Sequence, residues 1–383
     1  KWIEEDIRLM KESNFNSMRM AHYPHHRYYY DLADKYGLYV IDEANVESHG
    51  ISFYRETLPG GDPIWQNAII DRARSMVEAN KNHPSIVIWS LGNEAGAGEN
   101  FEIMAAYIRA LDSERPIHYH HMNSVADVMS YMYPSVGLLE SELNNPNIGK
   151  PIMLCEFAHS MGNSTGNMDE YAELMKKNNN FFAMYIWDWV DQGLYLEDEN
   201  GRMYWAYGGD FGDDPNDGNF NFNGLVFPDR QPQPALKQVK YSYQFVDFEP
   251  ADLREGELFL HNNYLDFNLS NFVLNWNLLE DGEAVQSGTV ESLDIESGRR
   301  GQVKIPIQKP ELSPGREYHL SVSLNLKEDV IWADKGYEAA IEQFEMPYGV
   351  MPAPVLSDEN VSDVEMTESD EVISVSSSQF KAE

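Results

Sequence analysis

Two glutamates stand where apolar segments of the chain end, and a carboxylate there needs a partner or a function. Glu94 follows SIVIWSL through a Gly-Asn turn, and Glu156 directly ends the run IMLC. Taking a charged group out of water without compensation is costly. Hydrolysis of a glycoside with retention requires a pair of carboxyl groups, one as acid/base and one as nucleophile. Each glutamate alone could equally be a solvated surface carboxylate, but the two together, among aromatic residues, favour a glycosidase.

A second group of candidate ligands lies in the loop after the apolar run LYVIDEAN. Glu47 and His49 are two residues apart, and a carboxylate with an imidazole at this separation can share a divalent cation. On its own the pair is a weak signal, because many ordinary loops carry the same two residue types.

Further aromatic and polar side chains stand at the ends of other apolar runs. Tyr133 and Trp187 offer flat faces on which a sugar ring could stack, although Trp187 in YIWDWVD could equally pack against the protein. His22 and His159 could donate hydrogen bonds to sugar hydroxyls or support neighbouring groups. The residues alone leave both interpretations open.

The elements that must position these residues alternate between strand and helix over residues 1–190. Apolar and β-branched runs predict strands at 14–22, 38–45, 85–91, 117–120, 128–132, 152–156 and 182–188. Helical periodicity predicts helices at 3–10, 27–36 (closed by a glycine), 65–77, 101–111 and 169–177.

This alternation implies parallel βαβ units. Seven strands are one short of a closed barrel and the chain opens on a helix, so the sequence predicts a (β/α)8 TIM barrel lacking its first strand. Polar residues just past the C-terminal ends of the strands would then form the active site. A doubly wound open sheet is the alternative. An open barrel would also expose two strands, 14–22 and 182–188, as edges.

The pattern changes after about residue 236. Short alternating runs such as EYHLSVSLNL, broken by DG, SG and PG turns, predict an immunoglobulin-like antiparallel β-sandwich. The expected domains are a catalytic barrel at 1–240, the sandwich at 241–350, and a Pro-, Ser- and acid-rich linker with the start of a further β domain at 351–383.

The composition excludes several classes of function. The 383 residues carry a formal net charge of −35, which would repel nucleic acid. No apolar run reaches the roughly 18 residues of a membrane span. The single cysteine, Cys155, rules out an internal disulfide. The sequence begins with Lys1 and not with an initiator methionine, and its charged, helical opening does not resemble a signal peptide. We therefore expect an internal fragment of a longer protein, with a cytoplasmic location expected and a periplasmic one left open.

Six ordered segments together form a specific pattern: RMAHYPHH, LYVIDEANVESHG, IVIWSLGNEAGAG, IMLCEFAHSMGNSTG, YIWDWVDQGL and YGGDFGDDPNDGNFNFNGLVFPDRQPQPAL. They resemble the large bacterial β-galactosidases of glycoside hydrolase family 2. The resemblance runs almost continuously from Trp2 to Phe245 and is looser beyond. It implies release of terminal non-reducing β-D-galactose from small β-galactosides such as lactose, through a covalent galactosyl-enzyme intermediate.

The resemblance also implies a role for each carboxylate. Glu94 would be the general acid/base and Glu156 the nucleophile. Glu47 and His49, together with Glu94, would hold Mg²⁺. Asn93 would contact the sugar 2-hydroxyl, a hydrogen bond that strengthens at the transition state.

The remaining implied positions surround the sugar. Galactose-pocket and nucleophile-supporting positions fall on His22, Tyr133, His159 and Trp187. A Na⁺ site beside the galactose 6-hydroxyl would use the carbonyl of Phe220 and the side chain of Asn223, which also binds substrate. The resemblance further implies a homo-oligomer for the full-length protein. The family's first barrel strand, N-terminal domains and last large domain have no counterpart in this chain.

Three rival functions remain. One is another activity of the same family, β-glucuronidase or β-mannosidase. No Asn-x-Lys element that would bind a substrate carboxylate is found near the strand ends, and the Glu47-x-His49 pair also favours a galactosidase. A non-catalytic carbohydrate-binding protein and a purely structural fragment are the others, and retention of both Glu94 and Glu156 argues against them.

Overall fold

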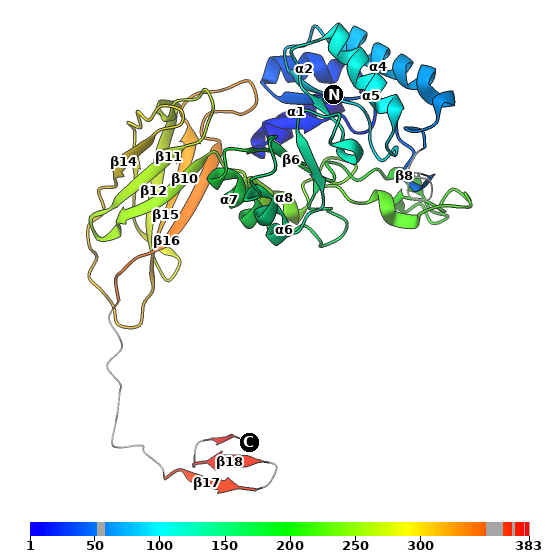
Figure 1. The fold of residues 1–383 in the computed structure, drawn as a ribbon. Helices are drawn as coiled ribbons and strands as arrows, with labels where there is room; N and C mark the ends of the chain where they lie inside the picture. Colours follow the sequence, from blue (N-terminus) through cyan, green and yellow to red (C-terminus); the bar gives the residue numbers. More distant parts are fainter. Residues whose placement is uncertain (52–57, 350–362, 370–371, 379, 383) are drawn as a thin grey trace.

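The computed structural model describes residues 1–51, 58–349, 363–369, 372–378 and 380–382. Parallel strands and helices alternate in its N-terminal half (Figure 1). One sheet has the order β1 (Ser17–Arg19), β2 (Tyr39–Glu43), β3 (Ile86–Ser90), β4 (Ile117–His118). A second has the order β5 (Met129–Met132), β6 (Ile152–Phe157), β7 (Phe181–Ile186). These strands and their parallel pairing confirm the strand positions predicted for the barrel.

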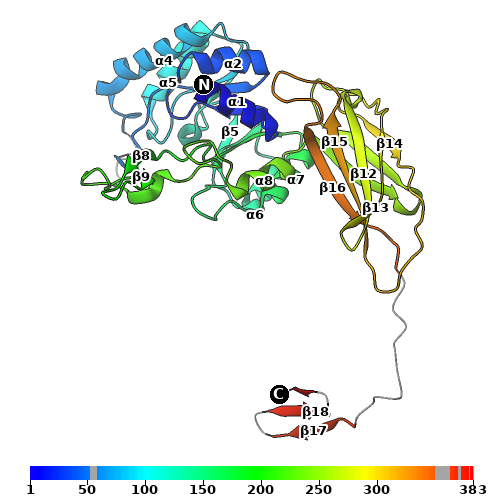
Figure 2. The ribbon, with the colours of Figure 1, turned by 180° about the vertical axis from the view of Figure 1, so that it is seen from behind.

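Helices cover the strands from two sides. Figures 1 and 2 show α2, α4 and α5 on one side of the strands and α6, α7 and α8 on the other. The helices are α1 (Trp2–Glu12), α2 (Tyr28–Tyr36), α4 (Gln66–Asn80), α5 (Glu99–Leu111), α6 (Val136–Leu143), α7 (Met168–Lys177) and α8 (Pro234–Ser242). Gly37 ends α2 as predicted, with φ of 69° and its N–H donating to the carbonyl of Ala33.

The two sheets form consecutive arcs of one wall. At the seam between β4 and β5, the Asp127 amide donates to the Ile117 carbonyl at 2.8 Å. At the opposite side, β1 and β7 are edge strands of their sheets, and the hydroxyls of Ser17 and Tyr185 meet across the gap at 2.6 Å. A small apolar core, which includes Ile41, fills the inside of the barrel. The larger core lies between strands and helices.

A β-sandwich follows the barrel, as predicted. One sheet holds β10 (Val246–Asp252), β11 (Glu257–Asn262) and β14 (Arg300–Lys304). The other holds β13 (Glu283–Val290), β12 (Phe272–Glu280), β15 (Tyr318–Leu326) and β16 (Glu338–Glu345). Alternate residues of β15 are buried, because successive side chains of a strand face opposite sides. Asn14 ties the two domains together by donating to the carbonyls of Lys240 and Ala339.

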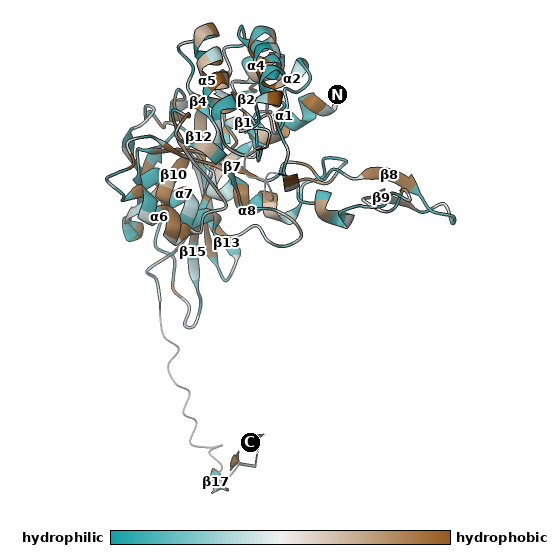
Figure 3. Ribbon diagram, turned by 45° about the vertical axis from the view of Figure 1, so that its right-hand side comes forward, coloured by the Kyte–Doolittle hydropathy of each residue, from teal (hydrophilic) through white to brown (hydrophobic). Residues whose placement is uncertain are grey.

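Several elements differ from the sequence-based expectation. Helices α6 and α8 were not expected, and α8 occupies the segment in which the sandwich pattern was thought to begin. A hairpin of β8 (Leu194–Glu197) and β9 (Met203–Ala206) projects from the barrel (Figure 3). Strand β17 (Glu365–Glu368) is an exposed strand within the expected linker. It pairs antiparallel with β18 (Ile373–Ser376), which lies in the segment expected to begin a further β domain. A third strand, β19 (Lys381–Ala382), completes this small sheet.

The remaining residues of the expected linker lie largely outside the described part of the chain. No helix in the described ranges is both long and apolar enough to cross a bilayer. The domain limits at 240 and 350 stay predictions.

Candidate active site

The C-terminal ends of the strands bring most of the predicted site residues together. Glu156 lies in β6, Tyr133 follows β5 directly, and Trp187 follows β7. The imidazole of His22, which lies beyond β1, stacks on the Trp187 ring with centroids 4.9 Å apart and planes 17° apart. Its Nε2 lies 4.0 Å from Glu156 Oε1. Residues far apart in the sequence therefore converge where a TIM barrel places its chemistry.

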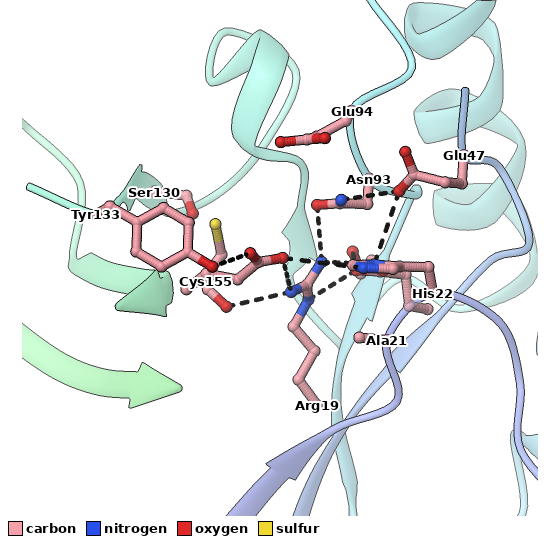
Figure 4. A network of polar contacts seen from close by, with 12 residues as sticks. Arg19, Ala21, His22, Glu47, Asn93, Glu94, Ser130, Tyr133 and Cys155 are labelled. Atoms are coloured by element: carbon pink, nitrogen blue, oxygen red, sulfur yellow. Dashed lines mark hydrogen bonds and ion pairs between the residues drawn. The ribbon is translucent and has the colours of Figure 1, made fainter. Parts of the chain in front are cut away.

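Both carboxylate oxygens of Glu156 accept hydrogen bonds, and the two donors, Arg19 and Tyr133, are labelled in Figure 4. Arg19 Nη1 donates to Oε1 at 3.0 Å, and the Tyr133 hydroxyl donates to Oε2 at 2.8 Å. Burial and the charge of Glu156 raise the pKa of Tyr133 well above its ordinary value, so the phenol keeps its proton and acts as a donor. Glu156 itself is only 6% exposed. A buried, oriented carboxylate of this kind suits a nucleophile.

Arg19 was not among the predicted site residues, yet it contacts three of them, Glu156, Asn93 and His22. Its Nε and Nη2 donate to the two oxygens of Glu43 at 2.8 and 3.0 Å, a bidentate pair. Nη2 also donates to Asn93 Oδ1 at 3.0 Å, and Nη1 to the carbonyl of Cys155 at 3.2 Å. The available signal was a charged residue inside a predicted barrel strand.

The charges around Arg19 reinforce one another. Burial alone would lower the pKa of Arg19, but the carboxylates of Glu43 and Glu156 outweigh it and hold the pKa above its ordinary value. Burial would likewise raise the pKa of Glu43, but Arg19 and the hydrogen bond from His22 lower it to about 2. Both groups are therefore ionised at neutral pH.

The turn that carries Asn93 and Glu94 depends on a glycine. Gly92 has φ of 141°, and a Cβ there would lie 2.4 Å from the Val46 carbonyl oxygen. This close approach lets the backbone N–H of Asn93 donate to that carbonyl at 2.9 Å. The Asn93 side chain then donates through Nδ2 to Glu47 Oε2 at 2.8 Å. Asn93 is thus oriented by Arg19 on its oxygen and by Glu47 on its nitrogen.

The predicted metal ligands also come together. Ligand atoms of Glu47, His49 and Glu94 all lie within 4.8 Å of one another, and His49 Nδ1 contacts Glu94 Oε2. Burial, with the charge of Glu94 adding to it, raises the pKa of Glu47. A divalent cation would relieve the repulsion between these two carboxylates. Two carboxylates and an imidazole therefore fit a divalent metal ion.

Three site residues hold an uncommon backbone conformation. His49, Glu94 and Tyr133 have φ of 37°, 35° and 49°. A residue other than glycine pays about 1–3 kcal/mol for such a conformation, and it persists only where its surroundings enforce it. Its presence at three positions of one site supports a functional constraint there.

The predicted sodium ligands are adjacent. Asn223 Nδ2 donates to the Phe220 carbonyl oxygen at 3.1 Å, and Asn223 Oδ1 is a buried oxygen without a hydrogen-bond partner. A buried polar atom of this kind calls for an explanation, such as an ion or water. The His159 ring lies 5.7 Å from the Phe220 ring and 5.9 Å from the Tyr133 ring, measured between centroids. His159 therefore lies between Phe220, a predicted sodium ligand, and Tyr133, which donates to Glu156.

Comparison with known proteins shows the family. The family described as glycosyl hydrolases family 2, TIM barrel domain, matches residues 1–248. The chain belongs to glycoside hydrolase family 2. A second family, described as β-galactosidase, domain 4, matches residues 258–347, which hold most of the sandwich.

Curated members of family 2 named β-galactosidase resemble the chain over most of its length. The Priestia megaterium protein is 42% identical, with 89% of this chain and 34% of that protein covered. The Vibrio vulnificus (strain YJ016) protein is 41% identical, covering 88% and 34%, and the Photobacterium profundum protein 40% identical, covering 92% and 36%. The chain thus spans about a third of the length of these relatives. A solved β-glucuronidase from Ruminococcus gnavus superposes at TM-score 0.49 and 21% identity, over 63% of this chain and 46% of that one.

Proposed function

We propose that this family 2 chain is the catalytic core of a retaining exo-β-galactosidase, with Glu156 as nucleophile and Glu94 as general acid/base. The observation that carries the proposal is the environment of Glu156. A carboxylate that accepts hydrogen bonds from a guanidinium and a phenol at the end of a barrel strand is oriented for attack. Glu94 follows β3, and the imidazole of His49 lies against its carboxylate.

In the first step, a carboxylate oxygen of Glu156 forms a bond to the anomeric carbon while the bond to the leaving oxygen breaks. Glu94 gives its proton to that leaving oxygen. In the second step, water gives a proton to Glu94 and attacks the same carbon. The bond to Glu156 then breaks, and galactose leaves with its original anomeric configuration.

We further propose that Glu47, His49 and Glu94 hold Mg²⁺. A bound cation would supply positive charge beside the acid/base and so influence its proton affinity. The chain's own part is to fix the position of Glu47, which Asn93 does through its amide. The second hydrogen of the Asn93 amide is left for a sugar hydroxyl, in our proposal the 2-hydroxyl.

We propose Na⁺ at the Phe220 carbonyl and Asn223 Oδ1, where it would order the pocket beside the sugar 6-hydroxyl. The unpartnered buried oxygen of Asn223 supports this assignment. His22 and Trp187 form a stacked wall that suits the apolar face of a galactose ring. Lactose is the simplest β-galactoside with this terminal sugar.

A β-glucuronidase would need a cation free to meet the substrate carboxylate. Arg19 is the guanidinium at the nucleophile, and Glu43, Glu156 and Asn93 already engage it. This arrangement favours a neutral sugar. A carbohydrate-binding protein without catalysis would not require the paired donors on Glu156.

The test is a panel of 2-deoxy-2-fluoro glycosyl fluorides with β-galacto, β-glucurono and β-manno configurations, incubated with the chain, Mg²⁺ and Na⁺. Intact mass reports a trapped glycosyl adduct. The proposal predicts an adduct with the galacto reagent alone, and none for Glu156→Gln. Reaction with the glucurono or manno reagent instead would replace the substrate assignment. Equal adduct formation by Glu156→Gln would refute the nucleophile.

A further inference from the structure

A chain of buried polar side chains crosses the inside of the barrel from β2 to β5. Ser90 Oγ lies 2.7 Å from Glu43 Oε2 and 2.9 Å from His118 Nδ1. His118 Nε2 lies 2.9 Å from Ser130 Oγ. Ser90 and His118 are 0% exposed and Ser130 is 1% exposed. Three polar side chains sealed from solvent must satisfy one another, so the direction of each hydrogen bond can be worked out.

The direction follows from Glu43. Arg19 and His22 offset the effect of burial and bring the pKa of Glu43 to about 2, so its carboxylate only accepts hydrogen bonds. The single hydroxyl proton of Ser90 therefore goes to Glu43, and Ser90 Oγ must accept from His118 Nδ1. Burial lowers the pKa of His118 to about 3, so its ring is neutral and carries one proton. That proton is on Nδ1, and Nε2 accepts from the Ser130 hydroxyl.

This row of hydrogen bonds also spans the seam between the two sheets of the barrel. β4 and β5 belong to different sheets, and His118 on β4 meets Ser130 on β5 across the gap. On one side lies Glu43, which holds the Arg19 guanidinium in place. On the other side lies β6, which pairs with β5 and carries the nucleophile. The position of Arg19 relative to Glu156 thus depends on a contact that His118 helps to fix.

We propose that His118 is a positioning residue: its Nδ1–H tautomer orders Ser90 and Glu43, and through them the Arg19 guanidinium that orients Glu156. The inference rests on the proposed function for its catalytic consequence, while its structural part stands without it. A histidine that only fills space would have no preferred tautomer and no effect on Arg19.

The matched variants are His118→Asn, His118→Gln and His118→Leu in the full chain. The Asn amide can donate from near the Nδ1 position, the Gln amide reaches only the Nε2 position, and Leu does neither. His261→Asn is the control, because His261 is a partly exposed sandwich residue that pairs with Glu249, far from the barrel strands. Three measurements are made: histidine ring nitrogen shifts, the Arg19 Nε–H signal in ¹⁵N spectra, and the rate of labelling by the galacto fluoride.

We expect a protonated Nδ1 and a bare Nε2 for His118 in the parent chain. His118→Asn should keep the Arg19 signal and stay within a few-fold of the parent labelling rate. His118→Gln and His118→Leu should shift or lose the Arg19 signal and label about 10- to 100-fold more slowly, because small displacements of reacting groups cost this much. A protonated Nε2 would overturn the proposal, as would equal losses for Asn and Gln with an unchanged Arg19 signal.

Should His118→Leu fail to fold, the parent tautomer and the Asn–Gln comparison still decide the matter. Should the parent chain take no label while the tautomer and the Arg19 response are as expected, the proposed function fails and the positioning role of His118 stands. Should the parent chain take the label while the His118 ring shows no preferred tautomer, the proposed function stands and the positioning role fails.

Discussion

Replacing Arg19 with methionine would leave two buried carboxylates without their cation. Removal of one partner from a buried ion pair costs about 3–5 kcal/mol of folding stability. For Glu43, the pKa falls from an ordinary value of 4.5 to about 2. At 1.36 kcal/mol per pKa unit, that difference corresponds to roughly 3 kcal/mol. This contribution is present above the ordinary pKa and is lost as the pH falls toward the folded value. We therefore expect Arg19→Met to be less stable by about 3–5 kcal/mol near neutral pH.

The assay is urea unfolding followed by intrinsic fluorescence between about pH 7 and about pH 3, a range over which Glu43 loses more than half of its contribution. At 1.36 kcal/mol per pKa unit, the stability gap between parent and Arg19→Met should narrow by about 2 kcal/mol by pH 3. Arg109→Met is the control, since Arg109 pairs with Asp127 at the surface and should cost about 0–1 kcal/mol. A gap that does not change with pH would show that Arg19 acts through packing and would refute the electrostatic argument.

Three further predictions concern single contacts of the site. Tyr133→Phe removes the hydrogen bond to Glu156, which is worth about 1.5–3 kcal/mol for a charged acceptor. Adduct formation should therefore slow by about 10- to 100-fold. An unchanged rate would show that the phenol does not support the nucleophile. Glu47→Gln should weaken Mg²⁺ binding measured by calorimetry at least about tenfold, since it removes one anionic ligand; undiminished affinity would place the ion elsewhere. Gly92→Ala should lower the melting temperature because its Cβ would collide with the Val46 carbonyl, whereas an unaltered melting curve would mean that the turn can relax.

Periodicity and residue type were sufficient to locate the barrel strands. Buried parallel strands read as short apolar runs, and the runs around Glu43 and Glu156 are of this kind. The C-terminal ends of parallel strands meet at one end of the barrel, so the contacts of Glu156 with Tyr133 and of His22 with Trp187 follow from topology. The roles proposed for these positions come from the family resemblance, because the same contacts could also serve a purely structural purpose.

Residues that act from within the barrel were harder to predict. Arg19 looks like a lone charge in a three-residue strand, and only its partners in space show why it is tolerated. His118 occupies a two-residue strand and meets Ser130 across a seam that no sequence pattern marks. The left-handed conformation of Glu94 was equally hidden, because glutamate has no local preference for it. The ion pairs of Arg19 and the backbone strain at Glu94 depend on residues that only the folded chain brings together.

The most direct test of the proposed chemistry is to locate the sugar after labelling with 2-deoxy-2-fluoro-β-galactosyl fluoride in the presence of Mg²⁺ and Na⁺. Peptide mapping of the adduct is predicted to place the galactosyl group on Glu156, as an ester of the carboxylate that Arg19 and Tyr133 hold. An adduct on Glu94 or on any other residue would contradict the assignment of Glu156 as nucleophile and Glu94 as acid/base.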